Sequence, residues 1–155
     1  MAAVSKSPRR DSPALEARLF VALLRAADHL AQDADALVKQ HGLTGTQYNV
    51  LRILRGAGSS GLPCKGIADR MISRDPDMTR LLDRMERRSL ITRQRQSEDR
   101  RVIKTCITPA GLEILKILDA PINELHKAQF RNVSAAKLKA LAEALQEAFP
   151  GLIPE

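Results

Sequence analysis

Apolar residues recur at helical spacing through most of the 155-residue chain. The pattern opens after the helix-start signal Ser12-Pro13 and stops at Gly42, where a left-handed C-terminal cap is expected. Between these points one apolar stripe predicts a long amphipathic helix of roughly 28 residues. The members of the stripe are Leu15, Leu19, Leu23, Ala26, Leu30 and Leu37.

Shorter helices are expected next. Thr44 and Gln47 have the spacing of a capping box and open the second helix, which breaks in the glycine-rich run 56–61. Leu62 is expected in a short strand. A short third helix carries three further apolar residues, which are Ile67, Ala68 and Met71.

The fourth helix has two contrasting faces. Asp75 is expected to cap it, Pro76 to occupy its first turn and Asp77 to complement its dipole. Its apolar arc consists of Met78, Leu81, Leu82 and Met85. The opposite arc holds Arg80 and Arg87, flanked by Thr79, Asp83 and Arg84. A buried face that docks the helix and an exposed face of guanidinium groups are typical of a recognition helix in the major groove of DNA.

Helical spacing is lost between residues 91 and 108. Two β-prone runs, Ile91–Arg95 and Arg101–Ile107, flank the polar turn 96–100 and predict a hairpin. Thr108-Pro109 then opens a fifth helix, which Pro121 is expected to kink or interrupt. Ser134 caps a last helix that ends at Pro150, so the chain is predicted to be mainly α with a two-stranded wing.

The charge is concentrated on the fourth helix and the hairpin. The chain has a formal net charge of +7, and the segment 65–104 alone holds 12 basic and 7 acidic residues, a net of +5. This concentration is the footprint expected of phosphate binding. Net charge alone leaves a merely basic soluble protein or an anionic membrane surface as alternatives. A basic helix together with a basic hairpin favours double-stranded DNA.

The hairpin tip supplies a second expected DNA contact. Arginine on a slender hairpin can enter the narrow minor groove, and either Arg100 or Arg101 is placed to do so. Asp99 can accept hydrogen bonds from the neighbouring arginine and fix its direction. Arg95, at the end of the first strand, and Arg74, just before the fourth helix, are expected to contact phosphates.

Two stretches of the chain resemble the MarR family of transcriptional regulators. Residues 67–71 and 75–86 resemble the recognition unit of that family, and Asp99-x-Arg101 followed by Ile107-Thr108-x-x-Gly111 resembles its wing signature. The resemblance spans essentially residues 14–149. It implies a winged helix-turn-helix fold and a homodimer in which the helices at both chain ends interleave. It also implies that Asp77, Thr79, Arg80 and Arg84 face the major groove and that Arg101 enters the minor groove, with Asp99 as its support.

The resemblance divides the chain into functional segments. Residues 1–12 are expected to form a disordered basic tail, 43–108 the DNA-binding domain, and 13–42 with 109–150 the helical dimerisation region. The apolar residues expected at the dimer interface are Leu15, Leu19, Leu23, Leu138, Leu141 and Leu145. The implied function is a repressor that binds a pseudo-palindromic operator as a homodimer and that a small molecule releases.

The sensing residues are the least defined part of the sequence. Relatives bind aromatic or phenolic effectors in a cleft near which His41 and Tyr48 are expected, although a packed tyrosine and a helix-end histidine are the simpler interpretation. Cys64 and Cys106 lack C-x-x-C spacing and are expected to be buried thiols in a reducing cytoplasm, with redox sensing through Cys64 as an alternative.

Other function classes find little support. The three histidines lack metal-ligand spacing, and no cofactor is expected. The sequence contains no motif that pairs a nucleophile with a general base, so an enzyme is not expected. No apolar run approaches the ~20 residues of a membrane span, and the N-terminus lacks a secretory signal, so a membrane partner is not expected. A winged-helix module that docks protein or nucleic acid without sequence specificity remains the alternative to an operator-binding regulator.

Overall fold

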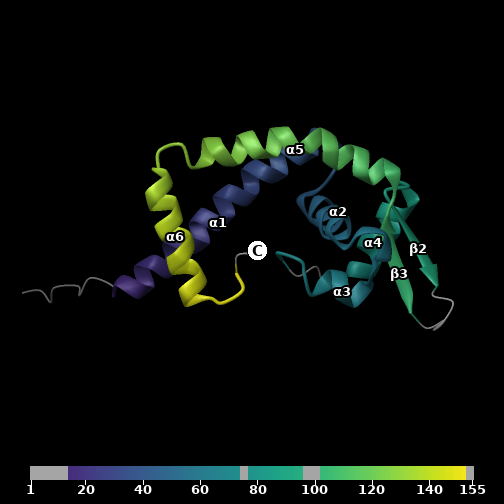
Figure 1. Cartoon of the computed structure of the whole chain (residues 1–155), viewed down its shortest axis with the longest axis horizontal. Coiled ribbons are helices and arrows are strands. Elements are labelled where there is room, and N and C mark those ends of the chain that lie inside the picture. The colour runs from purple at the N-terminus through teal and green to yellow at the C-terminus, as the bar shows by residue number, and fades with distance from the viewer. Residues whose placement is uncertain (1–13, 74–76, 96–101, 153–155) are drawn as a thin grey trace, which may run out of the picture.

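The chain is mainly helical, with a small antiparallel sheet, as expected from the sequence. The structure is a computed structural model, and it describes residues 14–73, 77–95 and 102–152. Its helices and strands follow the predicted order (Figure 1). They are α1 (Leu15–Lys39), α2 (Gly45–Ala57), the 3-10 turn η1 (Gly58–Ser60), β1 (Leu62–Pro63), α3 (Cys64–Ala68), α4 (Met78–Arg87), β2 (Ile91–Arg95), β3 (Ile103–Ile107), α5 (Pro109–Gln129) and α6 (Ala135–Ala148).

Helix α5 spans the molecule and joins two groups of elements. Helices α2, α3 and α4 lie with strands β2 and β3 around its first half, whereas α6 and the start of α1 lie toward its far end (Figure 1). Helix α1 packs against both α2 and α5 through its C-terminal half. The α5 amide of Gln129 donates to the backbone oxygen of Leu30 (3.3 Å) and to the carboxylate of Asp33 (3.2 Å), which fastens α5 to α1.

One hydrophobic core lies under α4 and between α2 and α5. Burial of these apolar side chains is the main force that holds the short helices in place. The core residues are Val38, Leu43, Val50, Leu51, Leu54, Ile67, Met78, Leu81, Leu82, Met85, Leu90, Ile91, Leu115, Leu118 and Ile122. The four apolar residues predicted for the buried face of α4 are all among them.

The sheet has three strands in the order β1-β3-β2. Strands β2 and β3 form the expected hairpin, in which Ile91 pairs with Ile107 and Arg95 with Ile103. The short strand β1 adds to the other edge of β3 through the pair Leu62 and Thr105. The sheet therefore ties the segment before α3 to the base of the hairpin.

Several predicted helix signals are confirmed. Gly42 has a φ of 73°, the left-handed conformation that glycine adopts without steric cost. Thr44 and Gln47 form a full capping box at the start of α2. Thr108 and Ser134 accept backbone hydrogen bonds as the N-caps of α5 and α6.

Three local expectations were wrong in whole or in part. The described part of the fourth helix begins at Met78 with Asp77 as its N-cap, because the Asp77 carboxylate accepts the backbone N–H of Arg80 at 3.1 Å. Asp75 and Pro76, the expected cap and first turn, lie outside the described residues. Helix α5 continues through Pro121, so the expected interruption was wrong, whereas the alternative of a kink stays a prediction. Burial of Leu118 and Ile122 on either side of the proline offsets the one lost backbone hydrogen bond. Helix α3 ends at Ala68, so Met71 follows it rather than belonging to it.

The helices at the chain ends bury little of their apolar surface within one chain. Helix α6 has no buried residue, and α1 has one, Val38. Leu15 is 72% exposed, and other large apolar side chains of α1 and α6 are exposed with it, namely Leu19, Phe20, Val21, Leu24 and Leu141. No helix in the described ranges is long and apolar enough to cross a membrane.

Candidate nucleic-acid interface and adjoining cleft

Helix α4 presents a charged face to solvent because its apolar face is held in the core. Thr79, Arg80 and Arg84 are exposed, as is Arg87. The Arg80 side chain is 80% exposed, and its Nε lies 3.1 Å from the carboxylate of Asp77. Three residues predicted to contact the major groove therefore share the solvent side of α4, while Asp77 lies at its N-terminus.

An arginine on the wing neutralises the acidic residues of α4. Arg93 of β2 donates from Nε to the Glu86 carboxylate at 2.9 Å and from a terminal nitrogen to Glu86 at 2.6 Å and Asp83 at 2.5 Å. Its backbone N–H also donates to Glu86 at 3.1 Å. The hydrogen bonds to Glu86, followed by those to Asp83, raise the pKa of Arg93. This cluster fixes β2 against α4 and leaves the exposed arginines to dominate the outer face.

The predicted wing residues are only partly described. Arg95 is exposed at the end of β2. Asp99, Arg100 and Arg101 lie outside the described residues, as does Arg74 before α4. Their expected contacts with DNA stay predictions.

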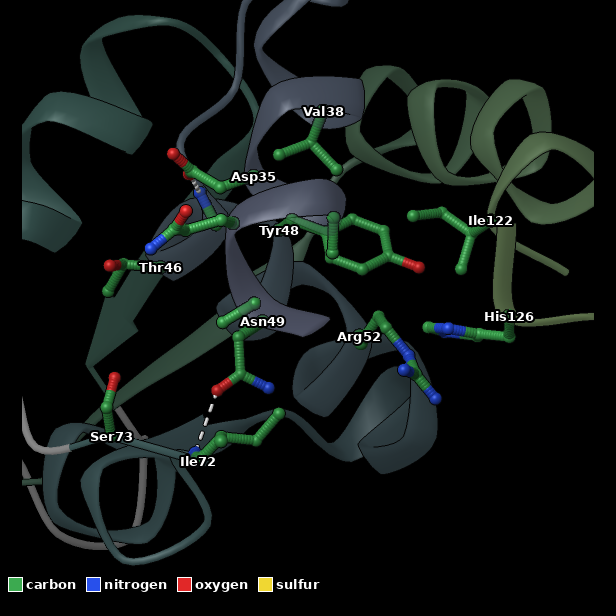
Figure 2. A pocket seen from close by; sticks show the side chains of 14 residues that line it. Asp35, Val38, Thr46, Tyr48, Asn49, Arg52, Ile72, Ser73, Ile122 and His126 are labelled. Atoms are coloured by element: carbon green, nitrogen blue, oxygen red, sulfur yellow. Dashed lines mark hydrogen bonds between the residues drawn. The ribbon is translucent and has the colours of Figure 1, made fainter. Parts of the chain in front are cut away.

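A cleft of about 490 Å³ lies between α1, α2, α5 and the two residues Ile72 and Ser73 (Figure 2). Its walls are mostly apolar, with polar groups at intervals, as is usual for small-molecule sites. The residues that line it are Ala31, Gln32, Ala34, Asp35, Val38, Gly45, Thr46, Tyr48, Asn49, Arg52, Ile72, Ser73, Ile122 and His126.

Three polar side chains meet at the α5 side of the cleft. Figure 2 shows the Tyr48 hydroxyl pointing toward Ile122 and His126, with the Arg52 guanidinium beside His126. The Arg52 guanidinium carbon lies 5.9 Å from the centroid of the Tyr48 ring, within the range of a cation–π contact. Burial raises the pKa of the Tyr48 hydroxyl, so Tyr48 is neutral at pH 7 and available as a hydrogen-bond donor.

The two residues predicted for the cleft have different outcomes. Tyr48 lines it, whereas His41 is exposed in the turn after α1 and is absent from the lining. His126 of α5 lines the cleft instead, because α5 packs along α1 and α2.

Asp35 joins α1 to the N-terminus of α2 at the other side of the cleft. One carboxylate oxygen accepts the backbone N–H of Gly45 at 2.8 Å, and the other lies 2.6 Å from the ammonium of Lys39. Hydrogen bonds from Lys39 and then from Gly45 lower the pKa of Asp35. The charged carboxylate therefore stabilises the junction between the two helices.

Replacing Asp35 with asparagine is expected to make stability less dependent on acid pH. Because its pKa is lower in the folded state, Asp35 contributes stability that is present above about pH 4 and lost as the pH falls through the folded pKa. D35N should be less stable than wild type at pH 7, and the difference should shrink toward pH 3. Urea unfolding at several pH values measures the difference in stability between D35N and wild type. A difference that is constant with pH would contradict the lowered pKa of Asp35.

The other predicted residue groups are placed as follows. Leu15, Leu19 and Leu141 are exposed, and Leu23, Leu138 and Leu145 are half-buried. Cys64 and Cys106 are free and half-buried, rather than fully buried. Among the described residues no group of histidine, cysteine and acidic side chains is arranged to hold a metal ion.

Comparison with known proteins decides the family. The model of the MarR family matches residues 43–103. The homoprotocatechuate degradative operon repressor of Escherichia coli is 30% identical over 129 residues, which cover 83% of this chain and 86% of that protein. The chain belongs to the MarR family.

Solved structures of MarR proteins share the fold. The MarR transcription factor from Planctomyces limnophilus is 36% identical and has a TM-score of 0.65, with 90% of this chain and 99% of that chain covered. BpsR from Bordetella bronchiseptica, whose DNA binding is regulated by 6-hydroxynicotinic acid, has a TM-score of 0.73 at 20% identity, with 84% and 98% covered. The predicted MarR winged helix-turn-helix fold is thus confirmed.

Sequence reasoning missed Arg93, Arg52, Asn49 and His126. A signal existed for Arg93, since it shares the phase of the buried Ile91 on β2 although it is charged. The three cleft residues carry no local signal. Asn49 and Arg52 lie three residues apart on α2, and His126 joins them only because α2 and α5, which are far apart in the chain, pack together.

Proposed function

We propose that this MarR-family protein is a homodimeric repressor that binds a pseudo-palindromic operator and that a small molecule releases from DNA. In this proposal residues 43–108 form the DNA-binding domain, and residues 13–42 with 109–150 form the dimerisation region. An operator-binding role also implies a protein of the cytoplasm.

The face of α4 carries the DNA-binding part of the proposal. Four of its apolar side chains are buried, so the helix is fixed in orientation, and its acidic residues Asp83 and Glu86 are bound to Arg93. Arg84 and Arg87 are left exposed beside Arg80 and Thr79. Such a face suits base edges and phosphates in the major groove.

The hairpin and the flanking loop are proposed to add backbone and minor-groove contacts. Arg95 and Arg74 would bind phosphates, and Arg100 or Arg101 would enter the minor groove with support from Asp99. These contacts would set affinity and salt dependence, whereas α4 would read sequence.

The exposed apolar surface of α1 and α6 supports the dimer. A large contiguous apolar surface is rarely left in water by a soluble monomer. A second copy would cover it, with Leu15, Leu19, Leu23, Leu138, Leu141 and Leu145 in the interface. Two α4 helices would then face half-sites ~10 base pairs apart or a multiple of one helical turn.

The cleft supports the effector. It lies where the long helices α1 and α5 meet α2, beside Ile72 and Ser73, and its volume of about 490 Å³ suits a small molecule. Arg52, His126 and the Tyr48 hydroxyl would bind an acidic or phenolic group, and the apolar walls would bind a ring. The structural neighbour BpsR is regulated by a ring compound of this kind.

Selection from a random pool of duplex DNA tests the proposal. The full-length protein should enrich an inverted repeat and prefer it to unselected duplex by a factor of ~10³ or more. Enrichment of no sequence, with equal binding to all duplexes, would favour the docking module without sequence specificity.

Replacing Arg80 with alanine is expected to weaken binding of the selected duplex by ~1–3 kcal/mol, with the loss concentrated at one base pair of each half-site. The reason is that Arg80 is exposed on the outer face of α4, where a guanidinium can reach base edges. Titrations of single-base variants of the duplex at fixed salt measure it. An equal loss on every variant would show that Arg80 contacts phosphate.

A further inference from the structure

Asn49 connects the cleft to the segment that leads into α4. It lies on α2 and lines the cleft, and its side-chain oxygen accepts the backbone N–H of Ile72 at 2.9 Å (Figure 2). Ile72 and Ser73 follow α3 and precede Met78, the first residue of α4. One side-chain hydrogen bond therefore links the cleft to a backbone atom close to the DNA-facing helix.

The Ile72 side chain adds little burial to this hydrogen bond. Its side chain is 88% exposed, although it is large and apolar, and it forms part of the cleft wall. Ala31 of α1 and His126 of α5 line the same cleft. Segments with few buried contacts open at low free-energy cost, so a molecule in the cleft acts on this segment before it acts on the core.

We propose that Asn49 is a positioning residue that couples occupancy of the cleft to the placement of α4. This inference rests on the proposed function, and it names the residue through which that regulation passes. When the cleft is empty, Asn49 holds the N–H of Ile72, six residues before the first residue of α4. A molecule in the cleft contacts Asn49 and Ile72 together, breaks their hydrogen bond and releases the Ile72 backbone, which changes the placement of α4.

The chemistry of Asn49 suits this role. Its amide carries both an acceptor oxygen and donor hydrogens, so a bound molecule offers it new partners in exchange for the Ile72 N–H. The other hydrogen bonds at the cleft are of a different kind. Asp35 binds Gly45, which is the first residue of α2, and joins two helices rather than a helix and the segment before α4.

A tethered side chain can take the place of an effector in the test. Ala31 faces the cleft from α1, so A31W puts an indole ring into it. Ala36 is exposed and lies about 140° further around the same helix, which makes A36W the matched control. At Asn49, N49L removes the acceptor at similar volume, whereas N49D keeps an acceptor oxygen.

The first measurement is amide hydrogen exchange in the full-length protein labelled with ¹⁵N-isoleucine. The measured quantity is the exchange rate of the Ile72 N–H relative to that of Ile67, whose side chain is buried in the core. N49L and A31W should each raise this ratio by about tenfold or more, whereas N49D and A36W should leave it near the wild-type value. An equal ratio in A31W and A36W would overturn the link between the cleft and Ile72.

The second measurement is affinity for the duplex selected above. A31W should weaken binding by about tenfold in the wild-type background but by less than about threefold in N49L, because both changes release the same segment. Equal tenfold losses in both backgrounds would overturn the role of Asn49. If selection enriches no duplex, the proposed function fails, and the exchange measurement alone still decides whether Asn49 couples the cleft to Ile72.

Discussion

Replacing Gly111 with alanine is expected to destabilise the protein by about 3 kcal/mol. Gly111 lies in the first turn of α5, where the chain passes very close to the backbone before β2. An added Cβ would lie 2.5 Å from the carbonyl oxygen of Leu90 and 2.8 Å from a side-chain carbon of Ile107. The contact with Leu90 is to backbone, which cannot rotate away as a side chain can. Helix α5 would have to move off the base of the hairpin.

A second glycine provides the matched control for this prediction. Gly56 lies in the last turns of α2, and an added Cβ there meets no atom within 4 Å. G56A should therefore stabilise the protein by about 0.4–1 kcal/mol, since alanine has the higher helix propensity and the smaller loss of entropy on folding. Urea unfolding of both variants measures the two effects. A G111A protein as stable as G56A would show that α5 does not pack as closely on the hairpin as described.

Replacing Arg93 with methionine is expected to weaken binding of the selected duplex by about 100-fold, or ~2.7 kcal/mol. The Arg93 side chain is 26% exposed and binds Glu86 and Asp83 of α4. Methionine would preserve packing but leave two uncompensated carboxylates on the helix that faces DNA, where they repel phosphates. It would also free β2 from α4, so the wing and the helix would no longer be held in one fixed arrangement. Titration at one salt concentration measures the loss.

Neutralising the two acids distinguishes this mechanism from a direct contact. In the R93M background, D83N and E86Q together should restore affinity to within about tenfold of wild type, because they remove the repulsion but not the loose wing. An unchanged loss in the triple variant would show that repulsion by the two carboxylates does not cause the loss of affinity. The charge-matched control is K127M, which removes a cation from an exposed ion pair with Glu124 on α5 and should change affinity by less than about twofold.

Local patterns predicted the order of the helices and the caps of α2, α5 and α6, but not those of α1 and α4, whose N-caps are Ala14 and Asp77. The buried face of α4 followed directly from the spacing of Met78, Leu81, Leu82 and Met85, because a helix brings such positions onto one side. The capping box of Thr44 and Gln47 lies within four residues and needs no knowledge of the fold. Boundaries that depend on tertiary packing were less predictable, as the uninterrupted course of α5 through Pro121 shows.

The candidate site was predictable only where its residues are close in sequence. The exposed arginines of α4 were identified because one helix displays them. The Arg93 cluster joins residues 7 and 10 positions apart across the turn between α4 and β2, and no periodic pattern reports such a contact. The cleft joins α1, α2 and α5, so Arg52, Asn49 and His126 are recognisable as a group only in three dimensions.

The exposed apolar surface of α1 and α6 has a genetic consequence. If that surface is buried between two copies, a mutant chain with an intact surface pairs with a normal chain as readily as with itself. Arg93 lies on β2, away from α1 and α6, so an R93M chain still forms dimers although it binds a half-site weakly. Co-expressed with the normal chain in equal amount, it would draw about half of all subunits into mixed pairs that hold the operator with one functional domain. Substitutions in the DNA-binding half would therefore behave as dominant alleles, whereas Leu15 or Leu19 substitutions that prevent pairing would be recessive.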